Sequence, residues 1–124
     1  MAQDPSATGK LTTHVLDPAR GCPAADMVIH LHRLAGPRRL PVRTVRTNSD
    51  GRVDGAMLSG DEMTAGTYEL VFHAGDYLRS AGDVLPDPAF LDIVPIRFGI
   101  ADPSAHYHVP LLISAYAYST YRGS

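Results

Sequence analysis

Short apolar runs separated by glycine and proline are the feature that most constrains this fold. The 124 residues include 11 glycines and 10 prolines, spread along the whole chain. Between them, residues 28–34 alternate in polarity, so that Met27, Ile29 and Leu31 point one way and His30 and His32 the other. Short alternating runs bounded by turn residues are typical of an all-β domain.

The remaining runs extend this pattern into a complete domain. Further strands are expected at 11–17, 41–47, 68–73, 90–98, 106–113 and 115–121, with a stub at 52–53. Residues 48–51 carry a turn signal, and only 75–81 could form a helix, closed by Gly82. Seven or eight short strands predict a two-sheet β-sandwich with one short helix. We expect residues 11–124 to form this domain and residues 1–10 to be a disordered N-terminal arm.

Composition excludes several other classes. Hydrophobic residues make up 44% and charged residues 19% of the chain, which excludes a disordered protein. No run of about 20 apolar residues exists, so no transmembrane helix is expected. A net charge of −2 argues against a nucleic-acid or anionic-membrane partner. A single cysteine, Cys22, excludes an internal disulfide, and the first residues lack signal-peptide features, so we expect a cytoplasmic protein.

The polar residues by themselves leave the chemistry open. His30 with His32, and His106 with His108, each place two imidazoles on one strand face, a spacing that can bind zinc. Neither pair has a third ligand nearby in sequence, and a solvated outer face is the favoured interpretation of His30 and His32. Cys22 has no adjacent base. On the residues alone, surface positions are the favoured interpretation of His14 and Arg52, and the segment 121–124 would ordinarily be a frayed end.

Four segments connect these residues through a resemblance. They are LTTHVLD at 11–17, SDGR at 49–52, HYHVPLL at 106–112 and YSTYRGS at 118–124. In this order and spacing they closely resemble the transthyretin-like family, and within it the branch of 5-hydroxyisourate hydrolases. The resemblance covers nearly the whole chain from Leu11 to Ser124, and the terminal YRGS is its most specific element.

The resemblance implies a transthyretin-like sandwich of about eight strands, assembled as a homotetramer with clefts between its dimers. It implies that a cleft contains the catalytic residues His14, Arg52, His108 and Ser124. The substrate-binding residues that it implies are His14, Arg52, His106, Tyr121, Arg122 and Gly123. Gly123 is expected to allow a sharp turn that brings Ser124 toward His108. No metal or other cofactor is expected.

The reaction implied is hydrolysis of 5-hydroxyisourate to 2-oxo-4-hydroxy-4-carboxy-5-ureidoimidazoline in urate breakdown. Water would attack the carbonyl of the six-membered ring, with His14 or His108 as the base and Arg52 paired with the substrate's oxygens and nitrogens. The residues do not decide between the two histidines, nor between the hydroxyl and the carboxylate of Ser124. A non-catalytic small-molecule carrier of the transthyretin type and an adaptor with an exposed strand edge remain as alternatives.

Overall fold

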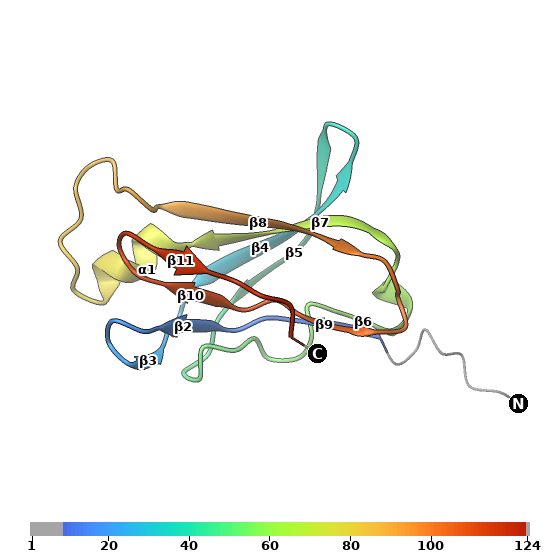
Figure 1. The fold of residues 1–124 in the computed structure, drawn as a ribbon, viewed down its shortest axis with the longest axis horizontal. Coiled ribbons are helices and arrows are strands. Elements are labelled where there is room, and N and C mark those ends of the chain that lie inside the picture. Colours follow the sequence, from blue (N-terminus) through green and yellow to red (C-terminus); the bar gives the residue numbers. More distant parts are fainter. Residues whose placement is uncertain (1–8, 124) are drawn as a thin grey trace, which may run out of the picture.

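The computed structural model describes residues 9–123 and places them in two packed β-layers with a short helix at one end (Figure 1). The first layer is an antiparallel sheet in the order β5–β4–β7–β8. Its strands are β4 (Val28–Ala35), β5 (Arg38–Arg46), β7 (Gly66–His73) and β8 (Ile93–Ile100). The helix α1 (Ala74–Ser80) follows β7 directly. No helix among residues 9–123 is long and apolar enough to cross a membrane.

The second layer is built around two strands that run parallel, each interrupted at its middle. β1 pairs with β9, and β2 pairs with β10, both in parallel. Short antiparallel neighbours flank them: β6 beside β1, β3 beside β2 and β11 beside β10. The strands of this layer are β1 (Lys10–Thr12), β2 (Val15–Asp17), β3 (Cys22–Pro23), β6 (Leu58–Ser59), β9 (His106–His108), β10 (Leu111–Ile113) and β11 (Tyr118–Ser119), and a 3₁₀ turn (Gly60–Glu62) follows β6.

The core lies between the layers and follows the alternation of the strands. Its completely buried side chains include Ile29, Leu31, Leu70 and Phe72 from the first layer and Leu11, Val15, Leu111 and Ile113 from the second. Burying each such side chain contributes about 1.5–3 kcal/mol. Because neighbouring residues of a strand face opposite ways, His14 and His108 are left on the outer side of the second layer.

The expected all-β sandwich with one helix is confirmed, with differences in detail. The expected strand 11–17 is interrupted at Thr13 and His14, and the strand 106–113 is interrupted at Val109 and Pro110, where proline has no N–H to donate. The stub at 52–53 is a single bridge between Arg52 and His14. The strand expected at 90–98 begins only at Ile93. β1 begins at Lys10, one residue inside the expected arm, and residues 1–8 lie outside the described residues.

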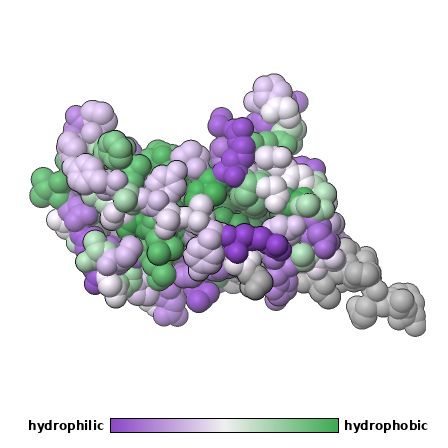
Figure 2. All heavy atoms as spheres, viewed as in Figure 1, coloured by the Kyte–Doolittle hydropathy of each residue, from purple (hydrophilic) through white to green (hydrophobic). Residues whose placement is uncertain are grey.

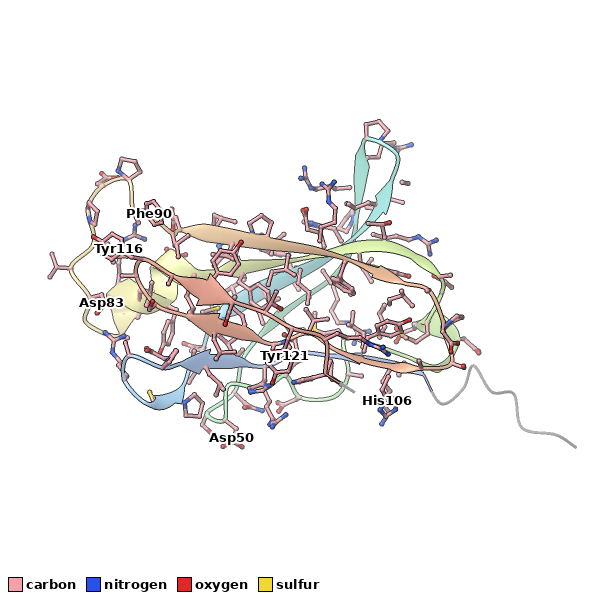
Figure 3. All side chains as sticks on the ribbon, viewed as in Figure 1. Asp50, Asp83, Phe90, His106, Tyr116 and Tyr121 are labelled. Atoms are coloured by element: carbon pink, nitrogen blue, oxygen red, sulfur yellow. The ribbon has the colours of Figure 1, made fainter. Side chains whose placement is uncertain are left out.

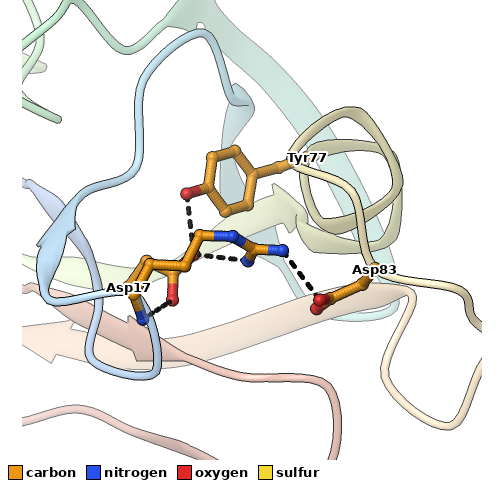
Figure 4. Close-up of polar contacts among 4 residues, drawn as sticks. Asp17, Tyr77 and Asp83 are labelled. Atoms are coloured by element: carbon orange, nitrogen blue, oxygen red, sulfur yellow. Dashed lines mark hydrogen bonds and ion pairs between the residues drawn. The ribbon is translucent and has the colours of Figure 1, made fainter.

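A buried carboxylate connects the end of β2 to the helix (Figure 4). Asp17 is completely buried and accepts hydrogen bonds from the Arg20 guanidinium at 2.8 Å, the Arg20 amide at 3.1 Å and the Tyr77 hydroxyl at 2.8 Å. Burial opposes ionisation of Asp17, but the hydrogen bonds from Arg20 and Tyr77 outweigh it and hold the pKa below its ordinary value of 3.8. The other side of the Arg20 guanidinium reaches Asp83 at 2.7 Å.

Replacing Asp17 by Asn should therefore cost about 2–3 kcal/mol of unfolding free energy at pH 7, because three donors lose a buried, charged acceptor. The pKa of Asp17 is lowered on folding, so its contribution is complete above pH 3.8 and is lost as the pH falls through the lower folded pKa. Urea unfolding at fixed protein concentration measures the loss. The matched control, Asp83→Asn, removes the more exposed partner of Arg20 and should cost under about 1 kcal/mol. Equal losses in the two variants would contradict this account.

Candidate active site

His14 occupies the interruption between β1 and β2, and its backbone is held from both sides. Its carbonyl accepts the amide of Leu111 at 2.9 Å, while the following residue, Val15, donates to the carbonyl of Gly51 at 2.8 Å. The preceding Thr13 is buried and donates its hydroxyl to the Val109 carbonyl at 2.7 Å. His14 is therefore fixed between β10, which follows His108 in the chain, and the loop that carries Arg52.

The loop that presents Arg52 is organised by Asn48 and Gly51. The side-chain oxygen of Asn48 accepts hydrogen bonds from the backbone amides of Asp50 at 2.9 Å and Arg52 at 3.1 Å. The backbone amide of Asn48 donates to the Arg52 carbonyl at 2.7 Å. Gly51 has φ of 72°, and a Cβ there would lie 2.3 Å from the Val15 carbonyl oxygen. Glycine is thus required both by conformation and by the close approach of the two chains.

His108 is brought to His14 by the register of the parallel strands β1 and β9. The Nε2 atom of His108 lies 2.9 Å from Nδ1 of His14, and the two rings stack with centroids 5.0 Å apart. At the other side of the ring, Nδ1 of His108 lies 2.8 Å from Oγ1 of Thr12. Thr12 was not among the residues predicted from the sequence. Its position two residues before His14, on the same strand face, was the only available signal, and its partner depends on the register.

The C-terminal segment lies beside β9. Gly123 exchanges two backbone hydrogen bonds with His108, at 2.7 and 3.3 Å. It pairs with His108 as an antiparallel bridge, and the turn expected to bring Ser124 toward His108 stays a prediction. A Cβ on residue 123 would lie 3.1 Å from both Cβ and Cδ2 of His108, so the side-chain-free glycine allows the tail to approach the His108 ring closely. Ser124 lies outside the described residues.

The other predicted binding residues divide between two faces of the second layer. His106 is exposed on the same strand face as His108, and Figure 3 shows it on the same side of the molecule as Asp50, in the loop that carries Arg52. Arg122 turns the opposite way: its guanidinium lies 4.3 Å from the ring centre of the buried Tyr107 and donates to the His106 carbonyl at 2.9 Å. Tyr121 is 57% exposed and, with Arg122, lines one side of a groove of about 260 Å³ whose other side is formed by β8.

The electrostatics of the site keep both imidazoles neutral near pH 7. Burial lowers the pKa of His14 below 6.5, and the positive charge of Arg52 and the neighbouring His108 lower it further. Burial and then Arg52 lower the pKa of His108 in the same direction. A neutral imidazole beside a fixed guanidinium can accept a proton while the cation stabilises developing negative charge.

No group of three or more His, Cys, Asp and Glu side chains within residues 9–123 is arranged to hold a metal ion. His30 and His32 lie on the outer side of β4, away from this site, with parallel rings 6.2 Å apart between centroids. Nδ1 of His30 contacts the Thr44 hydroxyl at 2.8 Å. This second pair of histidines is therefore not brought to His14.

The charge of Arg52 predicts how the two histidines titrate. In the parent protein, the NMR titration midpoints of His14 and His108 should both lie below pH 6.5. Arg52→Gln should raise both midpoints, because removing the cation makes protonation of each ring less unfavourable. Arg46→Gln on β5, whose guanidinium pairs with the exposed Asp26, is the matched control and should leave both midpoints in place. Unchanged midpoints in Arg52→Gln would show that the cation does not act on these rings.

Comparison with known proteins identifies the family of this chain. Residues 11–123 match the model of the HIUase/Transthyretin family. The chain is 66% identical to 5-hydroxyisourate hydrolase 2 of Rhizobium meliloti (strain 1021), over 96% of this chain and 99% of that protein. A crystal structure of (S)-allantoin synthase superimposes with a TM-score of 0.90 at 51% identity, over 95% of this chain but 44% of that one. The structure of 5-hydroxyisourate hydrolase of Klebsiella pneumoniae has a TM-score of 0.77 at 31% identity, over 94% and 99% of the two chains.

The family match and the relatives cover nearly the whole chain, including the segments that carry His14, Arg52 and His108. On this evidence, the chain belongs to the HIUase/Transthyretin family.

Proposed function

We propose that this protein hydrolyses 5-hydroxyisourate to 2-oxo-4-hydroxy-4-carboxy-5-ureidoimidazoline, in the breakdown of urate. The observation that carries the proposal is the 2.9 Å contact between His14 and His108 beside Arg52, in a chain 66% identical to a 5-hydroxyisourate hydrolase. The carrier alternative does not call for such a pair of neutral imidazoles, and relatives at 56–66% identity are named hydrolases.

The hydrogen bonds of the histidine pair favour His14 as the residue that exchanges protons with the substrate. Both ring nitrogens of His108 are engaged, one with Thr12 and one with His14. Nδ1 of His14 is engaged with His108, and its Nε2 has no hydrogen-bond partner within residues 9–123. His14 Nε2 takes a proton from water as the water oxygen bonds to the ring carbonyl carbon. The same proton then passes to the ring nitrogen as the carbon–nitrogen bond breaks, so the base is regenerated.

Arg52 supplies the positive charge. Its side chain is exposed and makes no hydrogen bond or ion pair within residues 9–123, while its backbone is held by Asn48. The guanidinium is therefore available for two parallel hydrogen bonds to the flat, oxygen-rich substrate. As the carbonyl becomes tetrahedral, the same group stabilises the oxyanion. The reaction requires no metal or organic cofactor.

The tail has two roles in this proposal. Tyr121, Gly123 and Ser124, together with His106, shape the substrate site, while Arg122 holds the tail on β9 through Tyr107 and the His106 carbonyl. Ser124 orients the attacking water or a histidine in this proposal.

Consumption of freshly prepared 5-hydroxyisourate, followed by ultraviolet absorbance, tests the function directly. The parent protein should remove the substrate well above the rate of its spontaneous decay, and a rate equal to that decay would contradict the function. Arg52→Lys should lower kcat/KM by about 100-fold, because lysine keeps the charge but loses the planar fork. The control Arg46→Lys, on an arginine of β5 outside the site, should keep full activity. Full activity in Arg52→Lys would show that Arg52 is a surface residue without a role in the reaction.

We also infer that the protein works as a cytoplasmic homotetramer. His14 and His108 are only partly covered, on the outer side of a sheet, so a second copy facing them would close the site against water. Exposed apolar side chains in β8 and β11 and in the residues just before them offer a surface for contacts between copies, among them Phe90, Ile93, Tyr116 and Tyr118. Figure 2 shows hydrophobic residues gathered on this face, over β8, β10 and β11.

Light scattering at micromolar concentration should give four times the chain mass of 13.3 kDa. Association of the subunits stabilises the folded state by mass action. The apparent stability should therefore also rise with protein concentration. A monomeric mass with full hydrolase activity would contradict the shared cleft.

A further inference from the structure

We propose that Thr12 is a positioning residue for the hydrolysis. Its hydroxyl accepts a hydrogen bond from Nδ1 of His108, and this arrangement leaves Nε2 of His14 with a free lone pair that can receive the proton. This inference rests on the proposed function and adds to it a residue that does not touch the substrate. It also states which hydrogen-bond arrangement of the histidine pair is competent as a base.

The backbone places Thr12 directly beside His108. Thr12 is in register with His108 in the parallel pair β1–β9, and its carbonyl accepts the Val109 amide at 2.9 Å. Oγ1 lies 2.8 Å from Nδ1 of His108. On the opposite side, Gly123 approaches the His108 ring so closely that a Cβ would meet Cδ2 at 3.1 Å. The His108 ring is thus held between a hydroxyl and a bare backbone.

The chain Thr12–His108–His14 has only two arrangements while both rings are neutral, because each contact contains one hydrogen. In one, Thr12 donates to His108, His108 donates through Nε2 to His14, and Nε2 of His14 carries a hydrogen. In the other, His108 donates through Nδ1 to Thr12, His14 donates through Nδ1 to Nε2 of His108, and Nε2 of His14 has a free lone pair. Only the second arrangement can take a proton from water.

Two effects favour the second arrangement. The positive charge of Arg52 acts on both rings and favours a lone pair over an N–H at the open end of the chain. Once His14 has gained the proton, the charged pair still donates through His108 Nδ1 to Thr12, and a hydrogen bond from a charged donor is stronger than a neutral one. Thr12 therefore stabilises the protonated pair more than the neutral pair.

The other charged or titratable groups around the pair lie farther along the same elements. Lys10 and His106 lie two residues before Thr12 and His108 on the same strand face. Arg122, on the tail, is turned to Tyr107 on the opposite face. Arg52 is the charged group whose influence reaches both His14 and His108.

The test compares Thr12→Val, which keeps the branched shape and removes the hydroxyl, with Thr12→Ser, which keeps the hydroxyl. Thr12→Val should lower kcat about 10- to 100-fold with little change in KM, because a hydrogen bond to the charged state is lost and the substrate is untouched. The acidic limb of its kcat/KM profile should move to lower pH, because the pair becomes a weaker base. Thr12→Ser should recover activity to within a few-fold of the parent.

Thr44→Val is the matched control. Thr44 contacts Nδ1 of His30 at 2.8 Å, the same pairing of groups, on the outer side of the other sheet. It should leave kcat and the pH profile unchanged. A parent-like Thr12→Val, a slower Thr12→Val whose acidic limb has not moved, or a Thr12→Ser as slow as Thr12→Val would each overturn the proposal.

A second measurement does not depend on turnover. Side-chain ¹⁵N shifts at pH 8 should show His108 and His14 protonated at Nδ1 in the parent protein. In Thr12→Val they should change to the Nε2-protonated form, which is the intrinsically preferred tautomer of the neutral histidine side chain. An Nε2-protonated His108 in the parent overturns the role of Thr12 even if the enzyme is active. A parent protein that does not exceed spontaneous decay overturns the proposed function, while the ¹⁵N spectrum still decides the hydrogen-bond arrangement.

Discussion

The contact between His14 and His108 is the interaction on which the site depends. It joins residues 94 positions apart, and it exists because β1 and β2 run parallel to β9 and β10. The other features of the site are arranged around this contact. The loop organised by Asn48 brings Arg52 beside His14. Thr12 contacts the His108 ring from one side, and Gly123 allows the tail to approach the same ring from the other. A sandwich layer with a central parallel pair is therefore the structural requirement for the chemistry.

The interruptions in the strands explain why the side chains of His14 and His108 are available for proton transfer. A continuous β-ladder would engage the backbone of His14 in regular pairing, with a flat row of side chains on the outer face. Instead, Thr13 bonds the Val109 carbonyl through its hydroxyl, and His14 pairs with Arg52 at a single bridge. Burial and the nearby guanidinium then keep both rings neutral, which is the state a general base needs near pH 7.

The fold could be predicted from the residues, whereas the site could not. Alternation in 28–34 and 68–73 identified β4 and β7 because buried side chains recur at every second position. β3 and β6 are two residues long and carry no periodic signal. His14, Arg52 and His108 were grouped by resemblance, because a contact across a parallel register leaves no trace in local sequence. The alternation of side chains along the tail does predict one further feature of the site. Because Gly123 lies against His108, the side chain of the preceding Arg122 points to the opposite face.

The central claim is that His14 and His108 act as one base, and a double-mutant cycle tests it most directly. The rate kcat/KM for 5-hydroxyisourate would be measured for His14→Ala, His108→Ala and the double variant, with the fold and oligomeric state of each compared with those of the parent protein. Residues that act as a unit lose their contribution together, so the double variant should be about as slow as the slower single variant. If the fold-losses in kcat/KM of the two single variants multiply in the double variant, each histidine acts independently of the other. That result would contradict the account.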